Sequence, residues 1–146
     1  VETRLKEMTP RNWGQSLLAC IGELNRYIKG WVAYYRQCSE EGVRNWKKMD
    51  AHVRRRLRAI VIRQRKRPRF LYRHLLSREV SASQAAKTAW SSRGVWHRSA
   101  RSGMHLGYRI DWFTERLVSL TTEWYRHNLP NLVSPVSEPQ LPLFAP

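Results

Sequence analysis

The sequence has 146 residues, with 27 Lys and Arg against 11 Asp and Glu, so its formal net charge is +16 and its pI is near 11.0. This length corresponds to one domain, and the large positive charge favours a polyanionic partner over an acidic substrate that needs only one or two basic contacts. A hydrophobic fraction of 42% and an aromatic fraction of 11% exclude a chain too polar to fold.

The first predicted helix covers residues 12–38. Thr9 has the residue type of an N-cap and Pro10 suits a first helical position, so we expect the helix to start there. Gly30 lies off the apolar face. Either the helix tolerates its cost in helix stability of about 1 kcal/mol relative to Ala, or another backbone approaches closely at this position. The apolar face itself consists of Trp13, Leu17, Cys20, Ile21, Leu24, Tyr27, Ile28, Trp31, Tyr35 and Cys38.

A second amphipathic helix is predicted over residues 43–67 and is expected to end at Pro68. A short third helix follows over residues 69–78. The spacing of Ser81 and Gln84 fits a capping box and predicts a small helix that continues to Trp90. The apolar face of the second helix consists of Val43, Trp46, Met49, Val53, Leu57, Ile60 and Val61.

The remaining chain predicts less regular structure. Residues 91–107 contain three glycines and several serines, so we expect mostly loop. Residues 108–127 have a helical apolar period, as one helix or two. Residues 130–146 hold five of the seven prolines and no Lys or Arg, which is typical of an extended or disordered tail. The sequence therefore predicts an all-α fold: a small helical bundle over residues 1–129, with two long amphipathic helices and shorter C-terminal helices.

Most of the charge is concentrated in residues 44–73, which contain thirteen Lys and Arg and a single acid, Asp50. A solvated helix face normally carries Glu near its cations, and this one does not. Ten of the thirteen are Arg, whose planar fork suits phosphate, so the pattern favours nucleic acid. A helix lying on anionic lipid is disfavoured, because the apolar face is needed for the core.

The candidate nucleic-acid-binding residues include three arginines of the segment 93–103, which mixes Arg, Gly and an aromatic residue as single-stranded RNA-binding segments do. Trp96 in that segment either contacts a base or fills the core, and the sequence favours the core. The full set is Lys47, Lys48, Arg54, Arg55, Arg58, Arg65, Lys66, Arg67, Arg69, Arg73, Arg93, Arg98 and Arg101.

Signals for catalysis, metals or membranes are weak. The five His show no metal-ligand spacing, and no nucleophile stands beside a base, so we expect neither an enzyme nor a cofactor. We expect Asp50 to temper the basic helix or to cap a contact. Cys20 and Cys38 would lie about 27 Å apart on one helix, too far for a disulfide, so both are interpreted as reduced. No apolar run approaches a membrane span, and residues 1–8 lack a signal-peptide core.

Three sequence motifs occur in one order: LNRYIKGWVAYY at 24–35, MDAHVRRRLR at 49–58 and RGVWHRS at 93–99. Over residues 9–127 this order resembles the maturase-specific domain, also called domain X or the thumb, of bacterial group II intron reverse transcriptases. Two departures are Met49, where Leu is usual, and Glu115-Arg116-Leu117, where Gly-Leu is common.

The resemblance implies a cytoplasmic bacterial protein that binds structured group II intron RNA and promotes splicing by the RNA. It also implies a thumb that grips a template–primer duplex in an intact reverse transcriptase. The Y-x-D-D signature of the palm does not occur in the sequence, so the chain is interpreted as a fragment of an RNA-directed DNA polymerase or a truncated reading frame. The alternative is a helical interaction protein whose basic face meets an acidic protein or DNA.

Overall fold

A computed structural model describes residues 2–10, 14–34, 40–126 and 128, without the side chains of residues 40–43. The described residues contain helices and no strand, which confirms the all-α prediction. The predicted tail at 130–146 and Cys38 lie outside the described residues.

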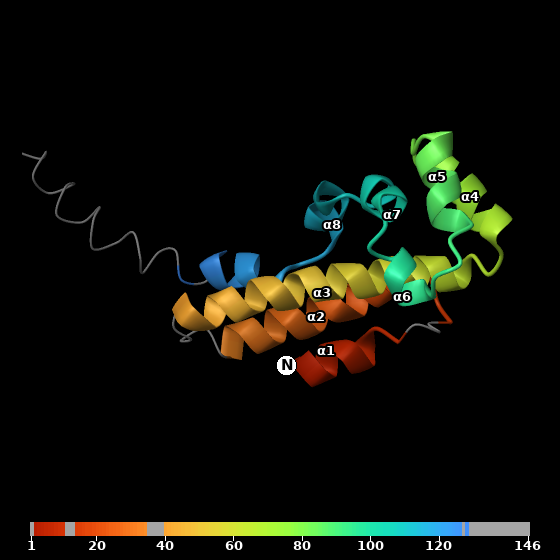
Figure 1. The fold of residues 1–146 in the computed structure, drawn as a ribbon. Coiled ribbons are helices and arrows are strands. Elements are labelled where there is room, and N and C mark those ends of the chain that lie inside the picture. The colour runs from red at the N-terminus through yellow and green to blue at the C-terminus, as the bar shows by residue number, and fades with distance from the viewer. Residues whose placement is uncertain (1, 11–13, 35–39, 127, 129–146) are drawn as a thin grey trace, which may run out of the picture.

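Two long helices form the body of the fold. Helix α2 (Leu17–Tyr34) and helix α3 (Glu40–Gln64) run antiparallel and side by side (Figure 1). Their apolar faces meet as predicted: Leu24 and Leu57 are fully buried, and the rings of Trp31 and Trp46 make an edge-to-face contact with centroids 5.3 Å apart.

The predicted start of the first helix is wrong. Thr9 follows a short helix α1 (Glu2–Met8) that the sequence did not predict, and its hydroxyl donates to the Leu5 carbonyl at 2.7 Å. Helix α2 begins only at Leu17, where the Ser16 hydroxyl accepts the backbone N–H of Ala19 at 3.2 Å. Thr9 therefore ends one helix instead of starting the next, because its hydroxyl bonds backward.

The second predicted helix ends three residues early. Helix α3 stops at Gln64, and Pro68 occupies the first turn of helix α4 (Pro68–Ser77). Arg67, just before it, is extended with φ −113° and ψ 147°, as the steric clash with a following proline requires. Pro68 thus starts a helix, where its missing N–H costs nothing.

Helix α5 (Ala82–Ala89) confirms the predicted small helix. The Ser81 hydroxyl accepts the Gln84 N–H at 3.4 Å, and the helix gives way at Trp90, as the capping pattern indicated. In the predicted segment 108–127, the chain forms helix α8 (Ile110–Arg116) and a second helical stretch over residues 120–126. Leu117 is extended between them, so the open choice resolves to two helices.

The predicted loop at 91–107 is wrong, because it contains helices α6 (Val95–Arg98) and α7 (Ser102–Gly107). Two of its glycines lie at close contacts, not turns. A Cβ on Gly103 would meet the Thr88 side chain and would lie 2.9 Å from the Gln84 carbonyl. A Cβ on Gly107 would lie 2.9 Å from Leu75. Gly30 has open space around it, so the close-approach alternative for that glycine finds no support among the described neighbours.

The hydrophobic core continues from the two long helices into the C-terminal helices. Met104, Phe113 and Leu120 are buried against it, and Trp46 also contacts Trp124 with ring centroids 6.2 Å apart. Cys20 is fully buried, and burial together with the charge of Glu23 raises the pKa of its thiol to about 11. The segments after α4 therefore fold back onto α3 and cover part of the surface that the sequence left exposed.

Candidate nucleic-acid interface

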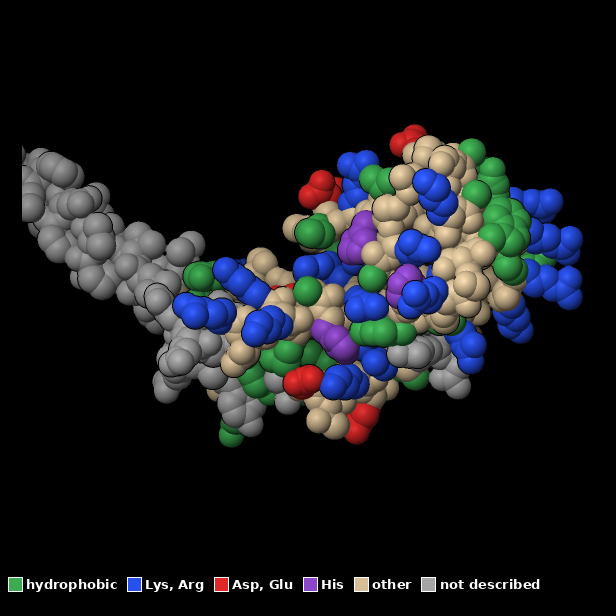
Figure 2. Space-filling view, in the orientation of Figure 1, with side chains coloured by type: hydrophobic (Ala, Val, Ile, Leu, Met, Phe, Trp, Pro, Cys, Tyr) green, Lys and Arg blue, Asp and Glu red, His purple; other side chains and the backbone are tan. Residues whose placement is uncertain are grey.

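The cations of α3 differ in exposure along the helix. Lys47 and Lys48 near its start are exposed, whereas Arg54 and Arg55 in the middle are half-buried. Arg58 is only 4% exposed. Lys and Arg side chains gather toward the start of α3 and at the end of the molecule where α3 meets α4 (Figure 2). The exposed charge of α3 is thus greatest near its two ends.

Arg58 lies inside the protein. Its Nε and Nη2 both donate to the Tyr108 carbonyl, at 3.1 and 2.8 Å, and its guanidinium lies 5.1 Å from the ring centroid of Phe113. Burial, and to a lesser degree the charge of Arg54, lowers the pKa of Arg58 to about 10. We therefore remove Arg58 from the set of candidate phosphate-binding residues, because helices α7 and α8 cover it.

Arg55 holds the segment that the sequence singled out for RNA. Its Nη2 donates to the Trp96 carbonyl at 2.7 Å, its Nε donates to the Ser99 hydroxyl at 3.2 Å, and its guanidinium stacks on the Trp96 ring at 4.0 Å. The ring of His52 also contacts the Trp96 ring, with centroids 5.3 Å apart. Trp96 is half-buried and packs against polar side chains of α3, so it does not fill the core as the sequence favoured.

The three arginines of the segment 93–101 are placed differently. Arg93 and Arg101 are exposed. Arg98 is half-buried, and its Nη1 donates to the Ala89 carbonyl at 3.4 Å. Burial lowers the pKa of Arg98. Arg93 and Arg101 thus present their charge to solvent, whereas Arg98 joins α6 to the end of α5.

Five exposed cations surround the turn from α3 to α4, and we call them the junction cations: Arg65, Lys66, Arg67, Arg69 and Arg73. All ion pairs among the described side chains lie elsewhere, at Arg4, Lys6, Arg116 and Arg126. Like charges this close repel one another unless an anion neutralises them. The junction cations therefore form an exposed and strongly positive surface at a helix–helix turn.

A groove of about 560 Å³ near the start of α3 is lined by both cations and carboxylates. Lys47 and Arg54 line it from α3, and Arg116 and Arg126 line it from the C-terminal helices. The sequence did not predict the last two, because they lie far from the basic segment 44–73. Both pair with glutamates of the same groove, Arg116 with Glu115 at 3.2 Å and Arg126 with Glu123 at 3.8 Å. At the floor of this groove, Asp50 accepts hydrogen bonds from the backbone N–H groups of Leu120 and Thr121 at 2.8 and 3.2 Å, so it caps a helix as expected.

Two alternative kinds of site are absent from the described residues. Among the described residues, no group of three or more His, Cys, Asp or Glu is arranged to hold a metal ion. Within the same part of the chain, no helix is both long and apolar enough to cross a membrane.

The comparison with protein families matches residues 1–79 to the group II intron, maturase-specific domain. This range is more than half of the chain and contains helices α1 to α4, with the basic face of α3 and the junction cations. The first two of the three sequence motifs lie within it, and the third, at 93–99, lies beyond it. The comparison with curated proteins gives no match. On the family match, the chain belongs to the family of group II intron maturase-specific domains.

Proposed function

We propose that this domain binds group II intron RNA through its exposed cations and thereby promotes splicing, with no catalytic group of its own. The junction cations carry the proposal, because these five exposed side chains make no ion pair among the described residues and present their positive charge to solvent. Neutralising phosphates with such cations releases condensed counterions and favours binding. In an intact reverse transcriptase, the same surface would grip a template–primer duplex.

The phosphate contacts are assigned to the exposed and half-exposed members of the predicted set. Arg55 and Arg98 make intramolecular hydrogen bonds and are assigned to positioning α6. This arrangement distributes the contacts over three surfaces: the first part of α3 up to Arg54, the α3–α4 junction and the residues on either side of α6. The contacting residues are Lys47, Lys48, Arg54, Arg65, Lys66, Arg67, Arg69, Arg73, Arg93 and Arg101.

The test is the salt dependence of binding to a group II intron transcript, measured by fluorescence anisotropy with the full chain. Each phosphate contact contributes about 0.7–0.9 to the slope of log affinity against log salt. Arg67→Gln and Arg69→Gln should each reduce the slope by about that amount. Arg4→Gln is the matched control, because Arg4 is exposed but pairs with Glu7 on α1 at 3.3 Å.

Affinity that barely changes between low and moderate salt would contradict the proposal. Equal affinity for the intron and for an unrelated folded RNA of the same length would contradict the intron-specific part alone. Crosslinking the chain to the transcript then maps the contacted residues, and crosslinks that avoid the junction would move the site elsewhere.

A further inference from the structure

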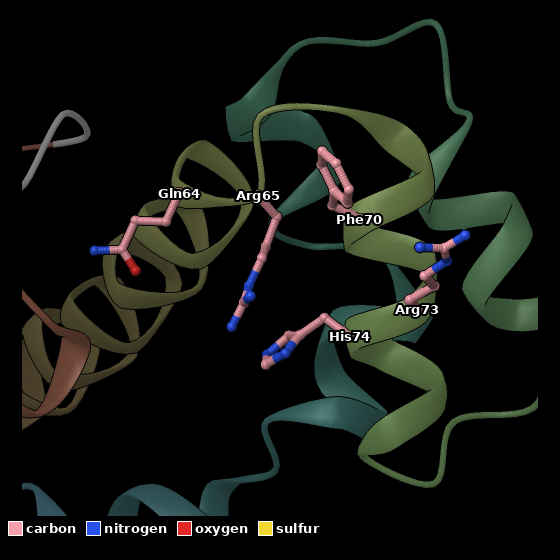
Figure 3. Close-up of a pocket in the computed structure, with 5 residues that line it drawn as sticks. All are labelled: Gln64, Arg65, Phe70, Arg73 and His74. Carbon is pink, nitrogen blue, oxygen red and sulfur yellow. The ribbon is translucent and has the colours of Figure 1, made fainter.

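A pocket of about 390 Å³ opens beside the junction cations. Gln64 and Arg65 line it from the end of α3, and Phe70, Arg73 and His74 line it from α4 (Figure 3). Arg65 and His74 point toward one another across the gap between the two segments. A volume of this order is at the small end of ligand pockets and is large enough for one nucleotide.

Phe70 is an apolar ring in a charged surface. It is 41% exposed although it lies in the first turn of α4, where Leu71 beside it is fully buried. The Arg69 guanidinium lies 4.9 Å from the Phe70 ring centroid. Arg69 does not line the pocket, so it contacts the ring from outside and leaves the pocket side for another planar group.

Hydrogen bonds hold two of the pocket's lining residues, His74 and Gln64, in place. His74 Nε2 and the Tyr108 hydroxyl share a hydrogen bond of 2.5 Å, and their rings stack with centroids 5.8 Å apart. Burial, with the charges of Arg65 and Arg78, lowers the pKa of His74 to about 4, so the ring is neutral at pH 7. Gln64 Nε2 donates to the Gln15 carbonyl at 2.7 Å. The pocket therefore combines a fixed neutral wall, an exposed aromatic ring and two cations.

We propose that this pocket binds one unpaired nucleotide of the RNA, with its base stacked on Phe70 and its phosphate held by Arg65. Every base has a π face that stacks on an aromatic side chain, and the Arg fork suits phosphate oxygens. The nucleotide is unpaired because a base inside a duplex has both faces covered by its neighbours. This inference rests on the proposed RNA binding and adds a preference for bulges, loops or strand ends.

The test compares two RNA stems that differ only in a single bulged nucleotide, which carries 2-aminopurine. Phe70→Ala should weaken binding to the bulged stem by about 5- to 100-fold, the range expected for one base–aromatic stack, and should change binding to the paired stem by less than twofold. Phe70→Trp should preserve both the affinity and the quenching of 2-aminopurine fluorescence on binding. Leu76→Ala is the matched control, because Leu76 lies on the same helix, is 40% exposed and does not line the pocket.

Three outcomes distinguish the proposed nucleotide pocket from the proposed RNA binding on which it rests. Loss of the bulge preference in Phe70→Ala, with Phe70→Trp and Leu76→Ala unchanged, supports the pocket. Equal binding of both stems by every variant, or no quenching with the wild-type chain, overturns the pocket and leaves the general RNA-binding proposal intact. A wild-type chain that binds neither the stems nor the intron transcript at low salt overturns the proposed function itself.

Discussion

Replacing Arg58 with Met distinguishes a structural arginine from a phosphate-binding one. Met keeps much of the length and apolar volume of the side chain but removes both hydrogen bonds to the Tyr108 carbonyl and the contact with Phe113. Hydrogen bonds from a charged donor contribute about 1.5–3 kcal/mol. The loss is partly offset, because the native protein buries a charge and Met does not. We expect Arg58→Met to lower the free energy of unfolding by about 1–3 kcal/mol.

The comparison variants make the reasoning quantitative. Arg58→Ala also leaves a cavity under α7 and α8, so we expect a larger loss of about 3–5 kcal/mol. Urea unfolding followed by far-UV circular dichroism gives both values, provided that the slope against urea stays constant. RNA binding, measured where both variants are folded, should keep its full salt dependence in Arg58→Met, whereas Arg67→Gln should reduce the slope by about 0.7–0.9.

Two results would refute the assignment of Arg58 to the interior. One is an unfolding midpoint for Arg58→Met equal to that of the wild type. The other is a reduction of the salt-dependence slope in Arg58→Met as large as that in Arg67→Gln, since only a side chain that reaches phosphate changes that slope.

Three further predictions concern stability. Asp50→Asn should lower the free energy of unfolding by about 1–2 kcal/mol, because the amide NH₂ cannot accept a hydrogen bond from Thr121; an unchanged urea midpoint would contradict the capping role. Gly103→Ala should lower the free energy of unfolding by about 2–4 kcal/mol, because the added methyl group clashes with Thr88 and the Gln84 carbonyl. Gly30→Ala should raise it by about 0.5–1 kcal/mol. Shifts of the melting temperature in the same direction for the two variants would contradict this contrast between a crowded and an open glycine. Stability should fall as the pH drops from about 7 to about 4, because unfolded His74 binds a proton near pH 6.5 and folded His74 only near pH 4. His74→Gln should flatten that dependence, and superimposable pH profiles for the two proteins would argue against it.

The long helices were predictable because their apolar residues recur with the helical period, which fixes the buried face before any partner is known. Their ends were not, because a cap depends on which neighbouring backbone group the side chain reaches. Thr9 bonds to the Leu5 carbonyl behind it, and nothing in its residue type distinguishes that from a bond ahead. Helix α1 was missed for a related reason: in seven residues it buries only Leu5, too little for a period.

The loop predicted for residues 91–107 shows why glycine is ambiguous in a single sequence. Glycine marks turns that need unusual backbone angles, but it also marks places where two helices touch. Gly103 against Thr88 and Gly107 against Leu75 are of the second kind. The sequence of residues 91–107 does not distinguish a turn glycine from a contact glycine, because the residues that contact these two glycines lie on α4 and α5.

The sequence predicted the positive charge of the candidate site but not which of its side chains stay exposed. A helical wheel gives the direction of each side chain on α3 but not which segment packs over it. The arginine run at 54–58 divides accordingly: Arg55 holds α6, Arg58 holds the start of α8 through Tyr108, and Arg56 donates to the Thr9 hydroxyl at 2.7 Å and so holds the end of α1.

This division changes how mutations in the arginine run must be interpreted. Replacing Arg55, Arg56 or Arg58 removes a bond between α3 and another segment, so loss of RNA binding in such variants would report misplaced helices as much as lost charge. Within the part of the chain that the structure describes, the side chains of the exposed junction cations make no such bonds, and Phe70 is exposed among them. We therefore expect replacements there to change the surface and leave the fold intact. The α3–α4 junction is therefore the place where RNA binding can be separated from folding in this domain.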